Sequence, residues 1–309
     1  MSGIGIRIAG RLGALALAWL LWFGPARAEP PLWVVRQGDA TVYLFGTVHL
    51  LPQDITWRSA RIDAVFAGAD TLWVETDTSL GLTSTVSLLR YGVSLSAPLS
   101  ARLGPDYALK LAMLAQNLGL DLRSLEHLRP WLAATMLEIA PVKRDGFDAA
   151  SGVDVSLEAE AHRLGKPVRR LETMSEQLRI FADLPEADEL AMLREAIDRA
   201  VEAAGQAVEG QAPEGQVAGG SDLRALALAW SAGDVEALQG LLAAELPPKN
   251  SPLYDALLRR RNHAWAERIQ GLLAEGHGTS FIAVGTAHLV GPDSVQSMLA
   301  PLGLQAERY

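Results

Sequence analysis

Apolar residues in this sequence follow two patterns: short uninterrupted runs, and longer stretches in which they recur every three or four positions. The short runs stand at 41–45, 71–74 and 281–284, are rich in β-branched and aromatic residues, and each stops at a Gly or a Glu. Runs of this length and composition predict buried strands. A further segment at 168–171 predicts a fourth, short strand, which stops at Glu172.

The longer stretches have the 3.6-residue period of amphipathic helices. Residues 80–140 contain no strand pattern, and we predict a mostly helical insertion there. A long helix is predicted from Ser251 to near Gly276, because Ser is favoured as an N-cap and the Pro that follows it as the first helical residue. Further helices are predicted at 54–69, 152–164, 173–204, 222–245 and 293–302.

Strands and helices alternate over much of the chain. This order is typical of an α/β fold, with α+β as the alternative. Residues 32–35 and 41–45 flank a short polar segment and predict an antiparallel hairpin. We therefore expect a mixed, mainly parallel central sheet flanked by helices, with the helical insertion added to it.

Two of the predicted strands are followed by the same five-residue pattern. It reads Gly-Thr-Val-His-Leu at 46–50 and Gly-Thr-Ala-His-Leu at 285–289. Each GxxH motif therefore places a His, either His49 or His288, just beyond the carboxyl end of a strand. Ligands of open α/β sheets bind at that edge. We predict that the two ends of the chain bring both His side chains to one site.

Carboxylates stand after the other two strands, at Glu75 and Glu172. Two neutral imidazoles with one or two carboxylates are a normal ligand set for a divalent transition metal, and three protein ligands beside a bound water are the pattern of catalytic sites. We predict His49, His288 and Glu75 as metal ligands. Glu75 and Glu172 are also candidates for taking and returning protons.

Arg261 lies on the apolar stripe of the long helix predicted near the end of the chain. There it could steady a carboxylate or a developing oxyanion, and it is our third candidate catalytic residue. Each assignment has a structural alternative. Arg261 could be an Arg whose aliphatic part packs while its head reaches solvent, and Glu75 and Glu172 could form ion pairs with neighbouring arginines.

The amino-terminal segment has a different composition from the rest of the 309 residues. Arg7 and Arg11 precede an apolar run from Leu12 to Phe23, and Ala-Arg-Ala at 26–28 fits a cleavage site. These features predict a signal peptide at 1–28, cut after Ala28, and hence a periplasmic or secreted protein. An uncleaved anchor is the alternative, but the run is short for a transmembrane span.

Charge and cysteine content narrow the function classes. Without residues 1–28 the chain has 24 basic and 36 acidic side chains, a formal charge of −12. Such an acidic chain is a poor candidate for binding nucleic acid or an anionic membrane surface. The chain contains no Cys, so thiol catalysis and thiolate metal sites are excluded.

Residues 205–221 hold five Gly and a Pro, with almost no large apolar side chains. This composition predicts a flexible loop. Because the second GxxH motif lies beyond it and the site needs both motifs, we expect residues 29–309 to form a single domain. The oligomeric state is left open by the sequence.

These motifs together resemble the TraB/GumN family, which is related to the Tiki metalloproteases. The matching segments run through nearly all of the chain after residue 28, in the order expected of that family. They are LFGTVH at 44–49, WVETD at 73–77, GVD at 152–154, GKPVRRLET at 165–173, RRRNHAW at 259–265, AVGTAHLVG at 283–291 and the terminal LGLQAERY.

The resemblance implies an α/β fold with a mixed sheet and a metal-dependent, peptidase-like hydrolase with a peptide or protein substrate. It favours Mn or Co as the metal, with Zn or Fe as alternatives, and His49, His288 and Glu75 stand at the motif positions. The other hypothesis is a binding or regulatory protein that uses the same cleft without turnover. Because the two His loops are not expected in the core, changing either His to Ala should leave the fold largely intact.

Overall fold

The computed structural model describes residues 29–76, 81–208 and 220–309. The predicted signal peptide and the central part of the predicted Gly-rich loop lie outside these residues. The strands are β1 Leu32–Gln37, β2 Ala40–Thr47, β3 Leu51–Pro52, β4 Thr71–Val74, β5 Phe147–Asp148, β6 Val168–Arg170, β7 Thr279–Gly285 and β8 Ala306–Arg308.

Helices connect and cover these strands. They are α2 Ala60–Gly68, α3 Leu82–Gly92, α4 Leu99–Leu103, α5 Pro105–Leu118, α6 Leu122–Glu126, α7 Pro130–Arg144, α8 Val153–Arg163, α9 Met174–Ala182, α10 Glu186–Val208, α11 Gly220–Ser231, α12 Val235–Glu245, α13 Pro252–Tyr254, α14 Arg260–Ala274 and α15 Val295–Leu299. Short 3₁₀ turns are formed at Ala149–Ser151, Thr286–His288 and Ala300–Leu302.

The central sheet has six strands in the order β6-β4-β7-β2-β1-β8. The four strands from β6 to β2 are parallel, whereas β1 runs antiparallel to both of its neighbours. This confirms the predicted mixed, mainly parallel sheet and the hairpin formed by β1 and β2. The strand β8 and the small β3–β5 pair were not predicted, because two or three residues carry too little pattern.

Each face of the sheet packs on its own apolar cluster. One cluster contains Phe45, Leu72 and Phe281 together with residues of α2, α8 and α11. The other contains Leu44 and Ile282, and α14 and α15 cover it. The alternation of neighbouring strand residues between the two faces explains why both faces are buried.

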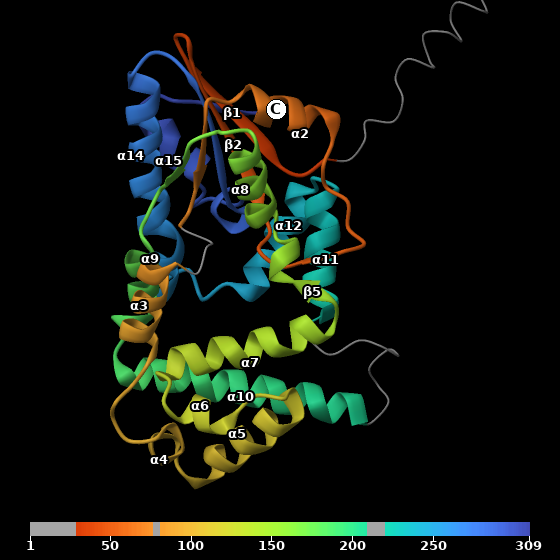
Figure 1. The fold of residues 1–309 in the computed structure, drawn as a ribbon, viewed down its shortest axis with the longest axis vertical. Coiled ribbons are helices and arrows are strands. Elements are labelled where there is room, and N and C mark those ends of the chain that lie inside the picture. The colour runs from red at the N-terminus through yellow and green to blue at the C-terminus, as the bar shows by residue number, and fades with distance from the viewer. Residues whose placement is uncertain (1–28, 77–80, 209–219) are drawn as a thin grey trace, which may run out of the picture.

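The helical insertion predicted at 80–140 is confirmed as α3 to α7. Together with α10, the helices α4 to α7 form a layer at one end of the molecule, away from the sheet (Figure 1). This layer has a separate core that includes Leu111, Leu125, Leu137 and Ile197. The candidate site described below lies at the sheet, outside this core.

Two predicted helix boundaries are wrong. The helix expected from residue 54 begins only at Ala60, because the side chain of Ser59 caps it by accepting the backbone N–H of Ile62. The segment expected as a loop from residue 205 is helical up to Val208, and helix resumes at Gly220. Within the described ranges no helix combines the length and apolar content needed to cross a bilayer.

The long helix predicted after residue 250 begins as expected, with Ser251 capping the N–H of Tyr254 and Pro252 in the first turn. It is not uniform, however. Residues Asp255–Arg259 form one turn of π-helix before α14 continues the same rod. Single π turns inside α-helices are frequent at functional sites, and this one ends immediately before α14, whose second residue is Arg261.

Candidate functional site

The carboxyl ends of the four parallel strands form one edge of the sheet, and the predicted site residues follow them there. Strands β2 and β7 are direct neighbours, with Thr47 opposite Gly285. Their loops therefore bring His49 and His288 together although 239 positions separate them in the sequence. Glu75 follows β4, the other neighbour of β7.

His49 is held from behind by a carboxylate. Its Nδ1 lies 2.6 Å from Oδ2 of Asp154, whose Oδ1 accepts the hydroxyl of Thr47 at 2.6 Å. Asp154 is buried, whereas the imidazole is 63% exposed. The charge of Asp154 raises the pKa of His49 to about 9. The ring is therefore a cation at neutral pH, with Nε2–H turned away from Asp154.

His288, unlike His49, is buried and neutral. Asn262 donates its amide N–H to the carbonyl of Asp293 at 2.6 Å, which turns Oδ1 toward His288. His288 Nδ1–H donates to that oxygen at 2.6 Å, and the ring lies 4.4 Å from the ring of Trp265. Burial, with the nearby charge of Arg261, lowers the pKa of His288 to about 3. The ring is neutral, with an acceptor at Nε2.

Glu75 lies between the two histidines. Its Oε1 accepts the backbone N–H of Gly285 at 2.6 Å and lies 3.8 Å from Nε2 of His288. Its Oε2 accepts from Arg261 at 2.6 Å and from Gln177 at 3.4 Å. Burial alone would raise the pKa of this carboxyl, but the facing groups, including the permanent charge of Arg261, outweigh it and lower the pKa to about 2.

Arg261 connects the cluster and uses every N–H that it has. Nε and Nη2 donate to the two oxygens of Glu172 at 3.0 and 2.6 Å, and Nη2 also reaches Glu75. Nη1 donates to the carbonyl of Leu257, in the π turn, at 3.0 Å and to Nε2 of His288 at 2.9 Å. A guanidinium has five N–H donors, so in this arrangement Arg261 has none left for a substrate.

Glu172 is the partner of Arg261 rather than an open acid. Both of its oxygens receive hydrogen bonds from Arg261. Burial raises the pKa of Glu172 in spite of that partner. The structure thus brings all five predicted residues together, but in two ranks. His49 alone borders the open side, whereas the side chains of Glu75, Glu172, Arg261 and His288 are buried behind it, each 7–11% exposed.

The space between the two imidazoles exists because residue 285 is a Gly. A Cβ added there would lie 3.1 Å from Oε1 of Glu75, 3.4 Å from Nε2 of His49 and 3.8 Å from Cδ2 of His288. Groups from three loops therefore surround one point where this chain has no side chain. A side chain at residue 285 would therefore crowd Glu75 and both imidazoles.

The described arrangement does not form a ready metal site. No group of three or more His, Cys, Asp or Glu side chains within residues 29–76, 81–208 and 220–309 is placed to hold a metal ion. The donors are of the right kind, but Nε2 of His288 is already bonded to the guanidinium of Arg261. That guanidinium would have to move before the imidazole could ligate, and the predicted metal stays a prediction.

Sequence reasoning did not identify the residues that orient the two histidines. Asp154 begins α8, and the preceding Gly152 lets α8 approach the His49 loop, because a Cβ there would lie 2.5 Å from the carbonyl oxygen of His49. The Gly-Val-Asp segment was a usable signal. Asn262 stands beside Arg261 on α14, and no local pattern distinguishes it.

An Asp154→Asn substitution should lower the pKa of His49 from about 9 toward the ordinary value of 6.5, because it removes the carboxylate charge. In the wild type, the His49–Asp154 pair stabilises the fold fully below pH 6.5, and this contribution disappears as pH rises through 9. NMR titration of the His49 ring measures the shift. His263, an exposed residue of α14, is the internal control. An unchanged His49 pKa in the variant would contradict this assignment.

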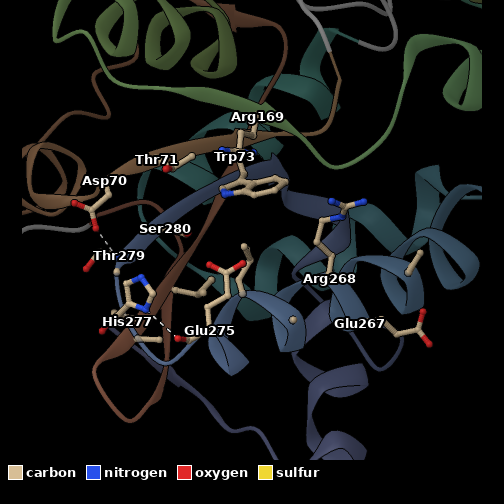
Figure 2. A pocket seen from close by; sticks show the side chains of 17 residues that line it. Asp70, Thr71, Trp73, Arg169, Glu267, Arg268, Glu275, His277, Thr279 and Ser280 are labelled. Atoms are coloured by element: carbon tan, nitrogen blue, oxygen red, sulfur yellow. Dashed lines mark hydrogen bonds between the residues drawn. The ribbon is translucent and has the colours of Figure 1, made fainter.

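Another groove lies elsewhere on the surface. A groove of about 880 Å³ runs between α14 and the amino-terminal parts of β2, β4 and β7, and none of the five site residues lines it (Figure 2). The candidate site lies instead at the carboxyl ends of these strands, where its side chains come together.

Comparison with known proteins places the whole described chain in one group. The TraB/PrgY/gumN family pattern matches residues 31–308. The uncharacterized protein YbaP of Escherichia coli (strain K12) is 24% identical over 294 residues, which cover 91% of this chain and 96% of YbaP, and YbaP of Shigella flexneri agrees to the same extent. An uncharacterized protein of Treponema pallidum (strain Nichols) is 24% identical over 286 residues, covering 86% of this chain and 79% of that protein. No solved structure matches.

Proposed function

The chain belongs to the TraB/PrgY/gumN family, and we propose that it is an exported, peptidase-like hydrolase whose reaction takes place between His49, Glu75 and His288. One observation carries the proposal. Two histidines from motifs that differ at one residue lie on either side of Gly285, one as a cation and one neutral, with an ionised carboxylate between them. Groups whose pKa values are pushed apart within one site are characteristic of acid–base catalysis.

His49 serves as the proton donor in this proposal. With Nδ1 bound to Asp154 and a pKa of about 9, the ring keeps its Nε2 proton at neutral pH. The imidazole is exposed, so a bound substrate can reach it. Protonating the leaving nitrogen of a peptide as its C–N bond breaks is the step that such a group supports.

Glu75 holds the attacking water. Its Oε1 faces the space beside Gly285, where a water can donate to it. A carboxylate with a pKa of about 2 is a weak base. It therefore orients the water first and accepts its proton only as the new C–O bond makes that proton acidic. Attack on the carbonyl carbon, proton transfer to Glu75 and proton donation by His49 together complete a hydrolysis.

The other residues of the cluster hold His49 and Glu75 in position. Arg261 balances the charges of Glu75 and Glu172, and its contacts fix the Glu75 carboxylate against Gly285. His288, held by Asn262, closes the buried side of the space. The resemblance-based expectation of a Mn or Co ion remains to be tested. His49, His288 and Glu75 would hold such an ion, which would supply an activated water, and His49 would then be a neutral ligand instead of the proton donor.

A digest with a defined peptide mixture, read by mass spectrometry, tests the proposal. Purified protein should cleave peptides, and His49→Ala should lower the rate by about 10²-fold or more, the usual contribution of a proton donor. His263→Ala is the matched control, because His263 is an exposed residue of α14 that lies outside the cluster. Its rate should equal that of the wild type.

Running the same digest with and without a chelator, alongside elemental analysis, decides whether a metal takes part. Loss of cleavage together with loss of bound metal would support the metal part of the proposal. Peptide binding without cleavage, in wild type and His49→Ala alike, would favour the non-catalytic binding protein instead.

A further inference from the structure

The groove beside α14 is a separate feature from the candidate active site. It is lined by the amino-terminal parts of β2, β4 and β7, by Arg169 of β6, and by one side of α14 (Figure 2). At about 880 Å³ it falls within the range of small-molecule sites. It is hollow because the facing stripe of α14 includes small residues. A Cβ added at Gly271 would meet no atom within 4 Å.

Two guanidinium groups of this groove lie near the same indole ring, that of Trp73. Arg169 stands directly opposite Trp73 in the β4–β6 ladder, and its guanidinium carbon lies 5.8 Å from the centre of the indole. Arg268, from α14, approaches the same ring at 5.7 Å. Trp73 is buried, so it is a fixed support, while both arginines are exposed.

Arg268 acts on the nearby Glu176 only through its charge, which helps to lower the pKa of that carboxyl. Within the residues that the structure describes, no Asp or Glu lies within ion-pair distance of Arg169 or Arg268. This contrasts with Arg261, whose donors are all used. Two unpaired guanidiniums that share one indole form a place where an oxyanion would receive charge-assisted hydrogen bonds from both sides.

A different part of the groove has the opposite charge. Asp70, Glu275 and His277 line it (Figure 2). Asp70 accepts the N–H of Thr279 at 2.7 Å and His277 contacts the carbonyl of Glu275 at 2.9 Å, so this part is held in place. The Glu275 side chain is exposed. A wholly anionic ligand would be repelled here, whereas an ammonium group would be attracted.

We propose that this groove binds a zwitterionic small molecule, with its oxyanion between Arg169 and Arg268 and its cationic group toward Glu275. A short peptide with free ends has this charge distribution. The site is distinct from the hydrolytic site, since the two are lined by different residues. It therefore stands whether or not the chain is a hydrolase.

Calorimetric titration with three probes tests this assignment: triglycine, N-acetyl-triglycine and inorganic phosphate. Wild type should bind triglycine more tightly than the acetylated peptide, which lacks the ammonium group. The double variant R169Q/R268Q should weaken binding of all three probes at least about tenfold, because it removes both charged donors. Mass spectrometry after each titration verifies that the peptides are intact.

Two further variants test whether binding depends on the residues of this groove. Arg90→Gln removes another Arg that lies over an aromatic ring, that of Tyr91, outside the groove, and should leave all three affinities unchanged. Glu275→Gln should reduce triglycine binding to the level of the acetylated peptide. Wild-type affinities in R169Q/R268Q, with circular dichroism showing an intact fold, would overturn the proposal, as would no binding of any probe to wild type. Equal affinity for triglycine and its acetylated form would overturn the cationic half.

Discussion

An Arg261→Met variant is expected to lose roughly 3–5 kcal/mol of unfolding free energy, the range for removing one partner of a buried ion pair. The substitution keeps most of the side-chain volume beside Trp265 but leaves Glu75 and Glu172 without their counter-charge. Their side chains are only 7% and 9% exposed. Two ionised carboxylates would then face each other with little access to water. Urea unfolding followed by circular dichroism measures the loss.

The pH dependence of this variant has a definite sign. Without Arg261 the pKa values of Glu75 and Glu172 rise in the folded state, so folding takes up protons as pH falls. The deficit relative to wild type should therefore shrink between pH 7 and pH 5. Arg259→Met is the control, because Arg259 pairs with Asp255 and Asp293 on a more exposed surface and should cost no more than about 1 kcal/mol. Equal losses for the two variants would contradict the central role of Arg261.

Replacing His288 or His49 by Ala is expected to lower the rate of the proposed hydrolysis in both cases, but to affect stability differently. His288 is buried, packs on the ring of Trp265 and donates to Asn262. Removing it leaves a cavity and an unpaired amide oxygen, which together cost roughly 2–4 kcal/mol. His49 is 63% exposed, so its removal leaves no cavity. The cost comes from buried Asp154, which loses its counter-charge but keeps Thr47 as a partner, and should be smaller, about 1–2 kcal/mol.

This difference corrects the sequence-based expectation that both loops lie outside the core. The expectation agrees with the exposure of His49 and is wrong for His288, because α14 covers the second loop. Thermal unfolding and a peptide digest of the two variants, side by side, check both statements. A His288→Ala variant as stable as His49→Ala would show that the buried contacts of His288 contribute nothing.

The sheet could be predicted because its central strands have a clear pattern in the sequence. The runs before His49, Glu75 and His288 are apolar, β-branched and sharply ended, and a parallel sheet buried on both faces requires such runs. The edge strand β8 has only the residues Ala306–Arg308. Its position depends on pairing with β1 and not on its own composition, so no local pattern could reveal it.

The predicted strand ends indicated that the candidate residues lie close together. They did not indicate that His49 and His288 have different charge states. The two GxxH motifs differ at one residue, yet the folded protein gives their histidines opposite charge states. The cause is the partner of each ring, Asp154 for one and Asn262 for the other. Both partners come from helices distant in sequence, and only tertiary packing decides which ring each one meets.

The pairing of β2 with β7 also has a consequence for the order of events during synthesis. These two strands carry the two motifs, and closing a flexible loop of the intervening length costs roughly 5 kcal/mol in its length-dependent part. Strand β2 pairs early with β1, but it cannot pair with β7 until residues 279–285 have been made. The helical layer, whose contacts are closer in sequence, can form earlier. The chain therefore remains without a site through almost all of its emergence, and any cleavage activity would start only when its last strands arrive.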